Sequence, residues 1–192
     1  AWSLATKGAS DDPDEETITP DVTDSQGPRP QVVFCQDSNF HDRFIVKMVE
    51  QLCSQMKFRL GDIAVLARKN DRVNHLRGLL SRAGMPVVHF RDEGFDIFEN
   101  KVKAVTINSA KGLEFPVVFL ADLDEGDLPR RLLVDDDDEL QAELRSERRI
   151  LYVGMTRAAE ALYLVTSQQD QSTFLNEINQ VTRVEPFTGG KA

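Results

Sequence analysis

The stretch from Val102 to Leu120 reads V-K-A-V-T-I-N-S-A-K-G-L-E-F-P-V-V-F-L and carries the clearest signal for the fold. Two short apolar runs, Val102 to Ile107 and Pro116 to Leu120, flank a turn of small, polar and charged residues. Apolar runs of this length without polar alternation are typical of strands that are buried on both faces. The stretch therefore predicts two interior strands of a parallel sheet.

Similar apolar runs recur along the chain and alternate with helical patterns. Further strands are expected at Gln31 to Cys35, Ile63 to Leu66, Val87 to Phe90 and Ala161 to Thr166. Apolar residues recur at helical spacing in Phe44 to Cys53, Val73 to Leu80 and Leu140 to Leu151, and a short last helix is expected at Thr173 to Asn179. The alternation predicts an α/β fold, a parallel sheet with helices on both faces.

The composition divides the chain into three parts. Residues 1–30 are rich in Asp, Glu, Thr, Pro and Gly without an apolar period, and are expected to be a flexible acidic linker or the end of a truncated helix. Residues 31–180 are long enough for one α/β domain. Residues 181–192 are interpreted as a C-terminal tail.

The net charge of −9 is concentrated in residues 1–30 and 121–139, so the rest of the chain is slightly basic. This balance argues against broad non-specific DNA binding by the chain alone, but it leaves room for a local phosphate-binding surface. The run Asp135 to Asp138 is expected to be a solvated loop or a helix start rather than a metal site.

The two cysteines, Cys35 and Cys53, match neither a metal motif nor a disulfide framework, and both are expected to be small buried hydrophobes. Together with the lack of a signal-peptide pattern or a bilayer-spanning run, this favours a cytoplasmic protein without a membrane partner.

Two segments carry groups suited to bind phosphate. The turn from Thr106 to Phe115 can offer backbone N–H groups, a hydroxyl and an ammonium to an anion. The segment S-E-R-R-I-L-Y-V-G-M-T-R-A, Ser146 to Ala158, places Arg157 where a helix is expected to end. An always-charged guanidinium fork in such a position suits a phosphoryl oxygen.

In this order, the two segments closely resemble motifs V and VI of the UvrD/Rep-type superfamily 1 DNA helicases. The segment D-I-A-V-L-A-R, Asp62 to Arg68, resembles motif IV, and Ser172 to Ile178 is similar to the segment that often closes this domain. The resemblance covers roughly residues 31–180. It implies the second RecA-like motor domain, a P-loop NTPase-type fold without its own P-loop, which packs against the first across a cleft that holds ATP.

The resemblance also implies roles for single residues. Arg157 is the arginine finger that reaches the γ-phosphate, and Arg68 is a second basic contact to that phosphate. Glu114 accepts from the nucleotide ribose, Gly112 allows close approach of the backbone, and Lys111 lies in the same nucleotide-binding turn. DNA contacts are expected from Thr106, Asn108 and Ser109, although the commonest family pattern has His at the position of Asn108.

What the sequence lacks limits what this chain does alone. It contains no Gly-x-x-x-x-Gly-Lys-Ser/Thr motif and no Walker B strand to accompany one; the apolar run that precedes Asp122, Asp124 and Glu125 only imitates one. The groups that hold ATP and Mg²⁺ are therefore expected mainly on the first RecA-like domain of the same parent chain, and this chain alone should not hydrolyse ATP. Only about 35 residues separate Arg68 from Thr106, so a large accessory insertion is not expected there.

The leading interpretation is the C-terminal motor domain of an ATP-dependent DNA helicase or translocase that moves 3′ to 5′ on single-stranded DNA. A second interpretation is a catalytically inactive helicase-like module that binds a protein partner. A third is an acidic-pocket signalling domain that uses Asp122, Asp124 and Glu125. Arg148 and Arg149, which adjoin Glu147, are expected to form structural ion pairs.

Overall fold

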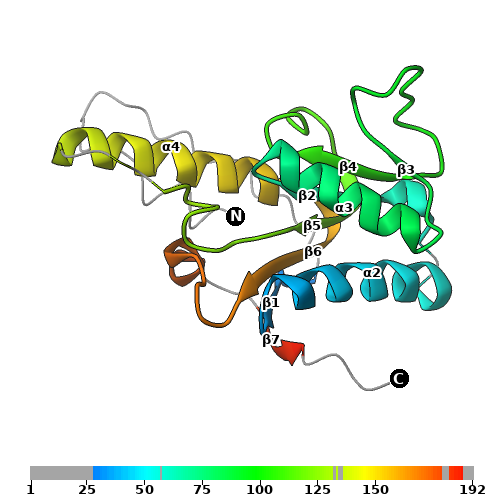
Figure 1. The fold of residues 1–192 in the computed structure, drawn as a ribbon, viewed down its shortest axis with the longest axis horizontal. Helices are drawn as coiled ribbons and strands as arrows, with labels where there is room; N and C mark the ends of the chain where they lie inside the picture. Colours follow the sequence, from blue (N-terminus) through cyan, green and yellow to red (C-terminus); the bar gives the residue numbers. More distant parts are fainter. Residues whose placement is uncertain (1–27, 57, 132, 134–135, 179–181, 188–192) are drawn as a thin grey trace.

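The structure is a computed structural model that describes residues 28–56, 58–131, 133, 136–178 and 182–187 (Figure 1). Seven strands form one sheet in the order β3-β4-β2-β5-β6-β1-β7, and every neighbouring pair is parallel. The strands are β1 (Gln31–Cys35), β2 (Ile63–Ala67), β3 (Val87–Val88), β4 (Val102–Thr106), β5 (Phe115–Leu120), β6 (Ala158–Ser167) and β7 (Thr182–Phe187). The expected parallel sheet is confirmed.

Helices cover both faces of this sheet, as expected. Helices α2 (Ser38–Gln55) and α3 (Asn70–Arg82) cover one face, and α4 (Asp137–Met155) with the 3-10 turn η2 (Thr173–Glu177) covers the other; a second 3-10 turn, η1 (Leu60–Asp62), leads into β2. The five residues of β2 are fully buried and alternate between the two cores. Because both faces are apolar and covered, a continuous apolar run such as I-A-V-L-A becomes a central strand.

The starts of two helices follow from local capping. The carboxylate of Asp37 accepts hydrogen bonds from the backbone N–H groups of Asn39 and Phe40, which caps α2. Asp136 caps α4 in the same way through the N–H of Glu139, and the next acidic residues lie in the first turn, where they offset the helix dipole. Residues 136–139 of the acidic segment are therefore a helix start.

The first turns of α4 extend away from the sheet (Figure 1). The buried residues of this helix are Glu147, Leu151, Gly154 and Met155, all in its second half. Leu140 and Leu144, on the first half, are only partly buried.

Three segments differ from the sequence-based expectation. β3 ends at Val88 rather than at Phe90, because His89 begins a turn in which Asp92 accepts from the His89 N–H. The last helix is a single 3-10 turn, η2. Part of the expected tail, Thr182–Phe187, forms the edge strand β7, which pairs with β1. Of the expected N-terminal linker, residues 1–27 lie outside the described residues.

Candidate functional site

The turn expected to bind phosphate is a crossover, residues 107–114, that runs from the end of β4 to the start of β5. At its start the hydroxyl of Thr106 accepts from the backbone N–H of Ser109 at 3.1 Å and lies 2.8 Å from the Ser109 hydroxyl. Gly112 adopts a φ of +85°, a left-handed conformation that L side chains rarely adopt. The crossover is therefore fixed by local hydrogen bonds and by one glycine.

Most of the predicted site residues on this crossover are accessible. Exposed residues are Asn108, Ser109, Lys111, Gly112 and Glu114. Thr106 is buried, so it shapes the turn rather than presenting its own hydroxyl at the surface.

Arg157 lies against the far end of the same crossover. Its Nε donates to the carbonyl oxygen of Val153, its Nη1 to that of Leu113 and its Nη2 to the hydroxyl of Thr156, each at 3.0 Å. The backbone also connects the segments, since the N–H of Phe115 donates to the Arg157 carbonyl. Among the described residues no carboxylate lies within salt-bridge distance of this guanidinium, so its charge is held by neutral oxygens alone.

Gly154 lets α4 approach the sheet closely enough for these contacts. A Cβ at this position would lie 2.9 Å from Cδ2 of Leu120 and 3.3 Å from Cγ2 of Ile107, and both of these residues are buried. The glycine therefore brings the end of α4 against β5 and the crossover.

Arg68, at the end of β2, contacts the middle of α4 instead. Its Nη2 donates to Oε1 of Glu147 at 2.9 Å and its Nε to Oε2 at 3.3 Å. Glu147 also accepts from the backbone N–H of Arg130, and its side chain is 1% exposed. Arg148 forms a structural ion pair, as expected, but its partner is Glu177 at 2.9 Å and not the adjoining Glu147.

Two of the predicted nucleotide residues, Arg68 and Arg157, contact α4. Arg157 itself lies two residues after the last residue of this helix, Met155. The guanidinium of Arg157 folds back by one turn to Val153, toward Glu147. Arg68 is thus held by a carboxylate of α4, whereas Arg157 is held by one backbone carbonyl of α4 and one of the crossover.

Sequence reasoning singled out Asp122 and Asp124 after β5, but it did not find the partners that the fold brings to them. Asp122, at a φ of +56°, accepts from Arg72 Nε at 2.5 Å and Nη2 at 3.0 Å, and from Nδ1 of the fully buried His41 at 3.0 Å. Burial opposes ionisation of Asp122, but the hydrogen bonds from His41 and Arg72 hold its pKa below the ordinary value. His41 and Arg72 come from α2 and α3, which are far from Asp122 in the sequence. The only sequence signal for this cluster is that His41 stands among apolar residues of its helix.

This cluster contains the atoms most able to approach a metal ion. One atom each from His41, Asp122 and Asp124 could lie around one ion, since these atoms are within 4.8 Å of one another. However, both oxygens of Asp122 already accept from Arg72, and Oδ1 of Asp124 accepts from the Thr166 hydroxyl and the Ser167 N–H. We therefore interpret the cluster as a set of structural hydrogen bonds that joins the end of β5 to α2 and α3.

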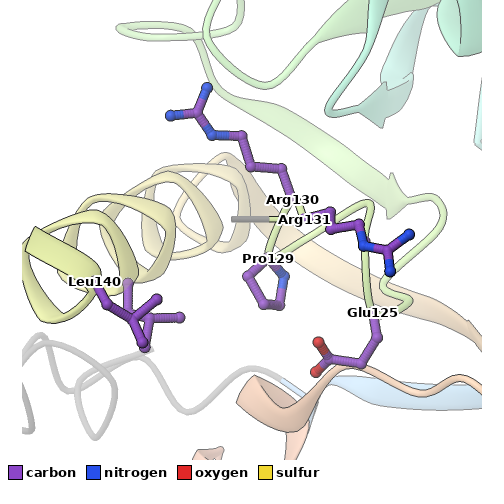
Figure 2. A pocket seen from close by; sticks show the side chains of 7 residues that line it. Glu125, Pro129, Arg130, Arg131 and Leu140 are labelled. Atoms are coloured by element: carbon purple, nitrogen blue, oxygen red, sulfur yellow. The ribbon is translucent and has the colours of Figure 1, made fainter. Parts of the chain in front are cut away.

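A groove of about 460 Å³ lies between the loop after β5 and the first half of α4 (Figure 2). Its lining residues are Glu125, Gly126, Pro129, Arg130, Arg131, Leu140 and Leu144. The Arg130 side chain pairs with Glu143 at 2.7 Å, while the carboxylate of Glu125 accepts from the Thr173 N–H.

None of the helices in the described part of the chain is both long and apolar enough to cross a membrane.

Comparison with known proteins identifies a family for part of the chain. The family model of the UvrD-like helicase C-terminal domain matches residues 88–169. The ATP-dependent DNA helicase PcrA of Bacillus subtilis is 41% identical over 91 residues, which cover 42% of this chain and 12% of PcrA. DNA helicase II of Escherichia coli is 40% identical over 73 residues, which cover 38% of this chain and 10% of the helicase. The chain therefore spans about a tenth of the length of these curated relatives.

Solved structures agree on the fold. The C-terminal domain of a possible DNA helicase from Lactobacillus plantarum WCFS1 superposes with a TM-score of 0.62 at 22% identity, covering 82% of this chain and 86% of that one. The DEAD-box protein SrmB of Escherichia coli gives a TM-score of 0.50 at 15% identity, covering 83% of this chain and 91% of that one. The solved structures show a RecA-like fold. The family match over residues 88–169 and the curated relatives identify this part of the chain as a C-terminal domain of the UvrD/Rep-type superfamily 1 helicases.

Proposed function

We propose that this chain is the second motor domain of a longer ATP-dependent DNA helicase or translocase that moves 3′ to 5′ along single-stranded DNA. The PcrA and DNA helicase II relatives support this proposal by their names and by their greater length. The first RecA-like domain of the parent would hold most of the ATP and Mg²⁺, and this chain would close the cleft from the other side. Closing and opening the cleft would then move the two domains along the strand.

The observation that carries the proposal is the setting of Arg157. A guanidinium bound only to carbonyl and hydroxyl oxygens has donors that can be exchanged for a phosphoryl oxygen without breaking an ion pair. An arginine that reaches the transferring phosphoryl group stabilises its developing charge, which contributes about 10³-fold or more to the rate. We therefore assign Arg157 as the arginine finger, with Arg68 as a second contact to the phosphate.

The exposed crossover supplies the remaining contacts. We assign the Glu114 carboxylate to the nucleotide ribose, the Gly112 backbone and Lys111 to the nucleotide, and Asn108 with Ser109 to the DNA backbone. Thr106 is buried and bonded to Ser109, so its contribution to DNA binding is to orient that serine. Each assigned surface group is accessible in this domain alone.

The test is ATP hydrolysis by the parent protein with and without single-stranded DNA, carrying either Arg157 or Arg157→Ala, beside this chain alone. We expect a DNA-stimulated parent, an inactive isolated chain, and a loss of about a hundredfold or more in Arg157→Ala. Arg157→Lys is the matched variant, because it keeps the charge but loses the planar fork. If Arg157→Ala hydrolyses ATP at the normal rate, the arginine-finger assignment is wrong and an inactive interaction module becomes the better reading.

A further inference from the structure

Glu147 and Arg68 form a contact that connects two segments of the nucleotide site. They are 79 positions apart in the sequence, on α4 and directly after β2. The Glu147 carboxylate is 1% exposed and the Arg68 side chain 19% exposed. Removing the partner of a carboxylate this buried is strongly destabilising, and the nearest guanidinium nitrogen, at 2.9 Å, belongs to Arg68; Nε of Arg130 is farther away, at 3.5 Å.

The geometry of the contact leaves one edge of Arg68 available. A guanidinium carries five N–H donors in a rigid fork. Glu147 occupies the edge formed by Nε and Nη2. Among the described residues Nη1 has no hydrogen-bond acceptor, so the edge formed by Nη1 and Nη2 can still bind an anion. Because the fork is planar, fixing one edge also fixes the direction in which the other points.

We propose that Glu147 is a positioning residue: it holds the rotation of the Arg68 guanidinium so that its free edge faces the nucleotide phosphate. This inference rests on the proposed function. Glu147 itself does not touch the nucleotide. By holding α4 and the end of β2 together, it also fixes Arg68 relative to the helix that ends just before Arg157.

The experiment is the kcat/KM for DNA-stimulated ATP hydrolysis by the parent carrying Glu147→Gln. The amide keeps the volume but has one acceptor oxygen, so it cannot hold both guanidinium nitrogens. We expect a loss of about tenfold or more. Glu143→Gln is the matched control: Glu143 lies one turn earlier on α4 and pairs with Arg130, whose Nε also lies 3.5 Å from Oε1 of Glu147, but it does not pair with Arg68. It therefore reports any effect that acts through Arg130. We expect its kcat/KM to stay within about twofold of the wild type.

A double-mutant cycle separates positioning from a general effect on structure. In an Arg68→Met background Glu147 has no Arg68 guanidinium to orient and keeps only Arg130, whose Nε lies 3.5 Å away, so Glu147→Gln should cause no further loss of kcat/KM. The double variant leaves no buried carboxylate unpaired. If Glu147→Gln lowers kcat/KM by the same factor in both backgrounds, or no more than Glu143→Gln does, the inference is wrong while the motor proposal stands. A parent with no ATP hydrolysis at all refutes the motor proposal, and this inference with it.

Arg68→Lys covers the case in which Glu147→Gln does not fold. A lysine can keep the charge pair with Glu147, but a single ammonium does not offer a second rigid edge. We therefore expect Arg68→Lys to lose as much kcat/KM as Arg68→Met. Activity close to that of the wild type in Arg68→Lys would contradict the positioning role.

Discussion

Gly154→Ala tests whether close packing positions the end of α4, the helix that ends just before Arg157. The new Cβ would lie 2.9 and 3.2 Å from the two Cδ atoms of Leu120 and 3.3 Å from Cγ2 of Ile107. Both neighbours are in the core, with little room to move. Overpacking of this kind costs about 1–3 kcal/mol. Alanine regains about 1 kcal/mol over glycine inside a helix. With contacts to two buried side chains we take the upper part of the range and expect a net loss of ~1–2 kcal/mol.

Gly78→Ala is the matched control, because Gly78 is also inside a helix, α3, and makes no such contact. A Cβ there would meet only Nη1 of Arg82, at 3.4 Å, and this is the flexible end of a side chain. We expect the helix propensity of alanine to dominate and to raise the free energy of unfolding by about 1 kcal/mol. The two variants should therefore differ by ~2–3 kcal/mol.

The assay is urea denaturation of the chain, followed by far-ultraviolet circular dichroism, with each free energy of unfolding extrapolated to water. If Gly154→Ala is stabilised as much as Gly78→Ala, the close approach of α4 to Leu120 and Ile107 is not a constraint on this fold. The reasoning that assigns Gly154 to positioning the end of α4 would then be refuted.

Three further predictions concern buried groups. Asp122→Asn should lower the free energy of unfolding by about 3 kcal/mol at pH 7. Because the pKa of Asp122 is lowered in the folded protein, its contribution to stability is complete above the ordinary pKa of 3.8 and is lost as the pH falls through the folded pKa. The free energies of unfolding of the two proteins, measured by urea denaturation, should therefore become equal in acid. Burial raises the pKa of the Cys35 thiol to about 12, so at pH 8 a thiol reagent should label the half-buried Cys53 first and Cys35 only after unfolding; equal rates in the folded protein would contradict this. Phe119→Ala should cost ~3–5 kcal/mol in urea denaturation, since this buried ring stacks on Tyr163 with ring centroids 4.7 Å apart; a loss below 1 kcal/mol would show that the site repacks.

The central strands were predictable from the sequence because they are buried on both faces. β2, β4 and β5 appear as continuous apolar runs, and their parallel order follows from the helical patterns between them. β7 was not predicted, because T-R-V-E-P-F has neither an apolar run nor clear alternation and contains a proline, which is tolerated at a sheet edge. Pairing with β1 therefore decides its structure.

The candidate site was predictable only as separate segments. The resemblance identified Arg68, the crossover and Arg157, but it did not indicate which side chain holds each of them. Glu147 adjoins Arg148 and Arg149 in the sequence, yet its partners are Arg68 and Arg130, the latter through both its backbone N–H and its Nε. Neighbours on a helix point in different directions, whereas the fold brings the end of β2 to the buried side of α4. Tertiary packing therefore decides this pairing.

The different anchors of Arg68 and Arg157 have a consequence for the proposed motor cycle. Arg68 is held by a buried carboxylate, and separating this pair would leave an uncompensated charge, so Arg68 should stay in place when the cleft opens. Arg157 is held by carbonyl and hydroxyl oxygens, and exchanging these for a phosphoryl oxygen replaces neutral acceptors with a charged one. Within the proposed motor, Arg157 is therefore the cation that changes partners when the cleft closes on ATP, while Arg68 forms a fixed part of the site.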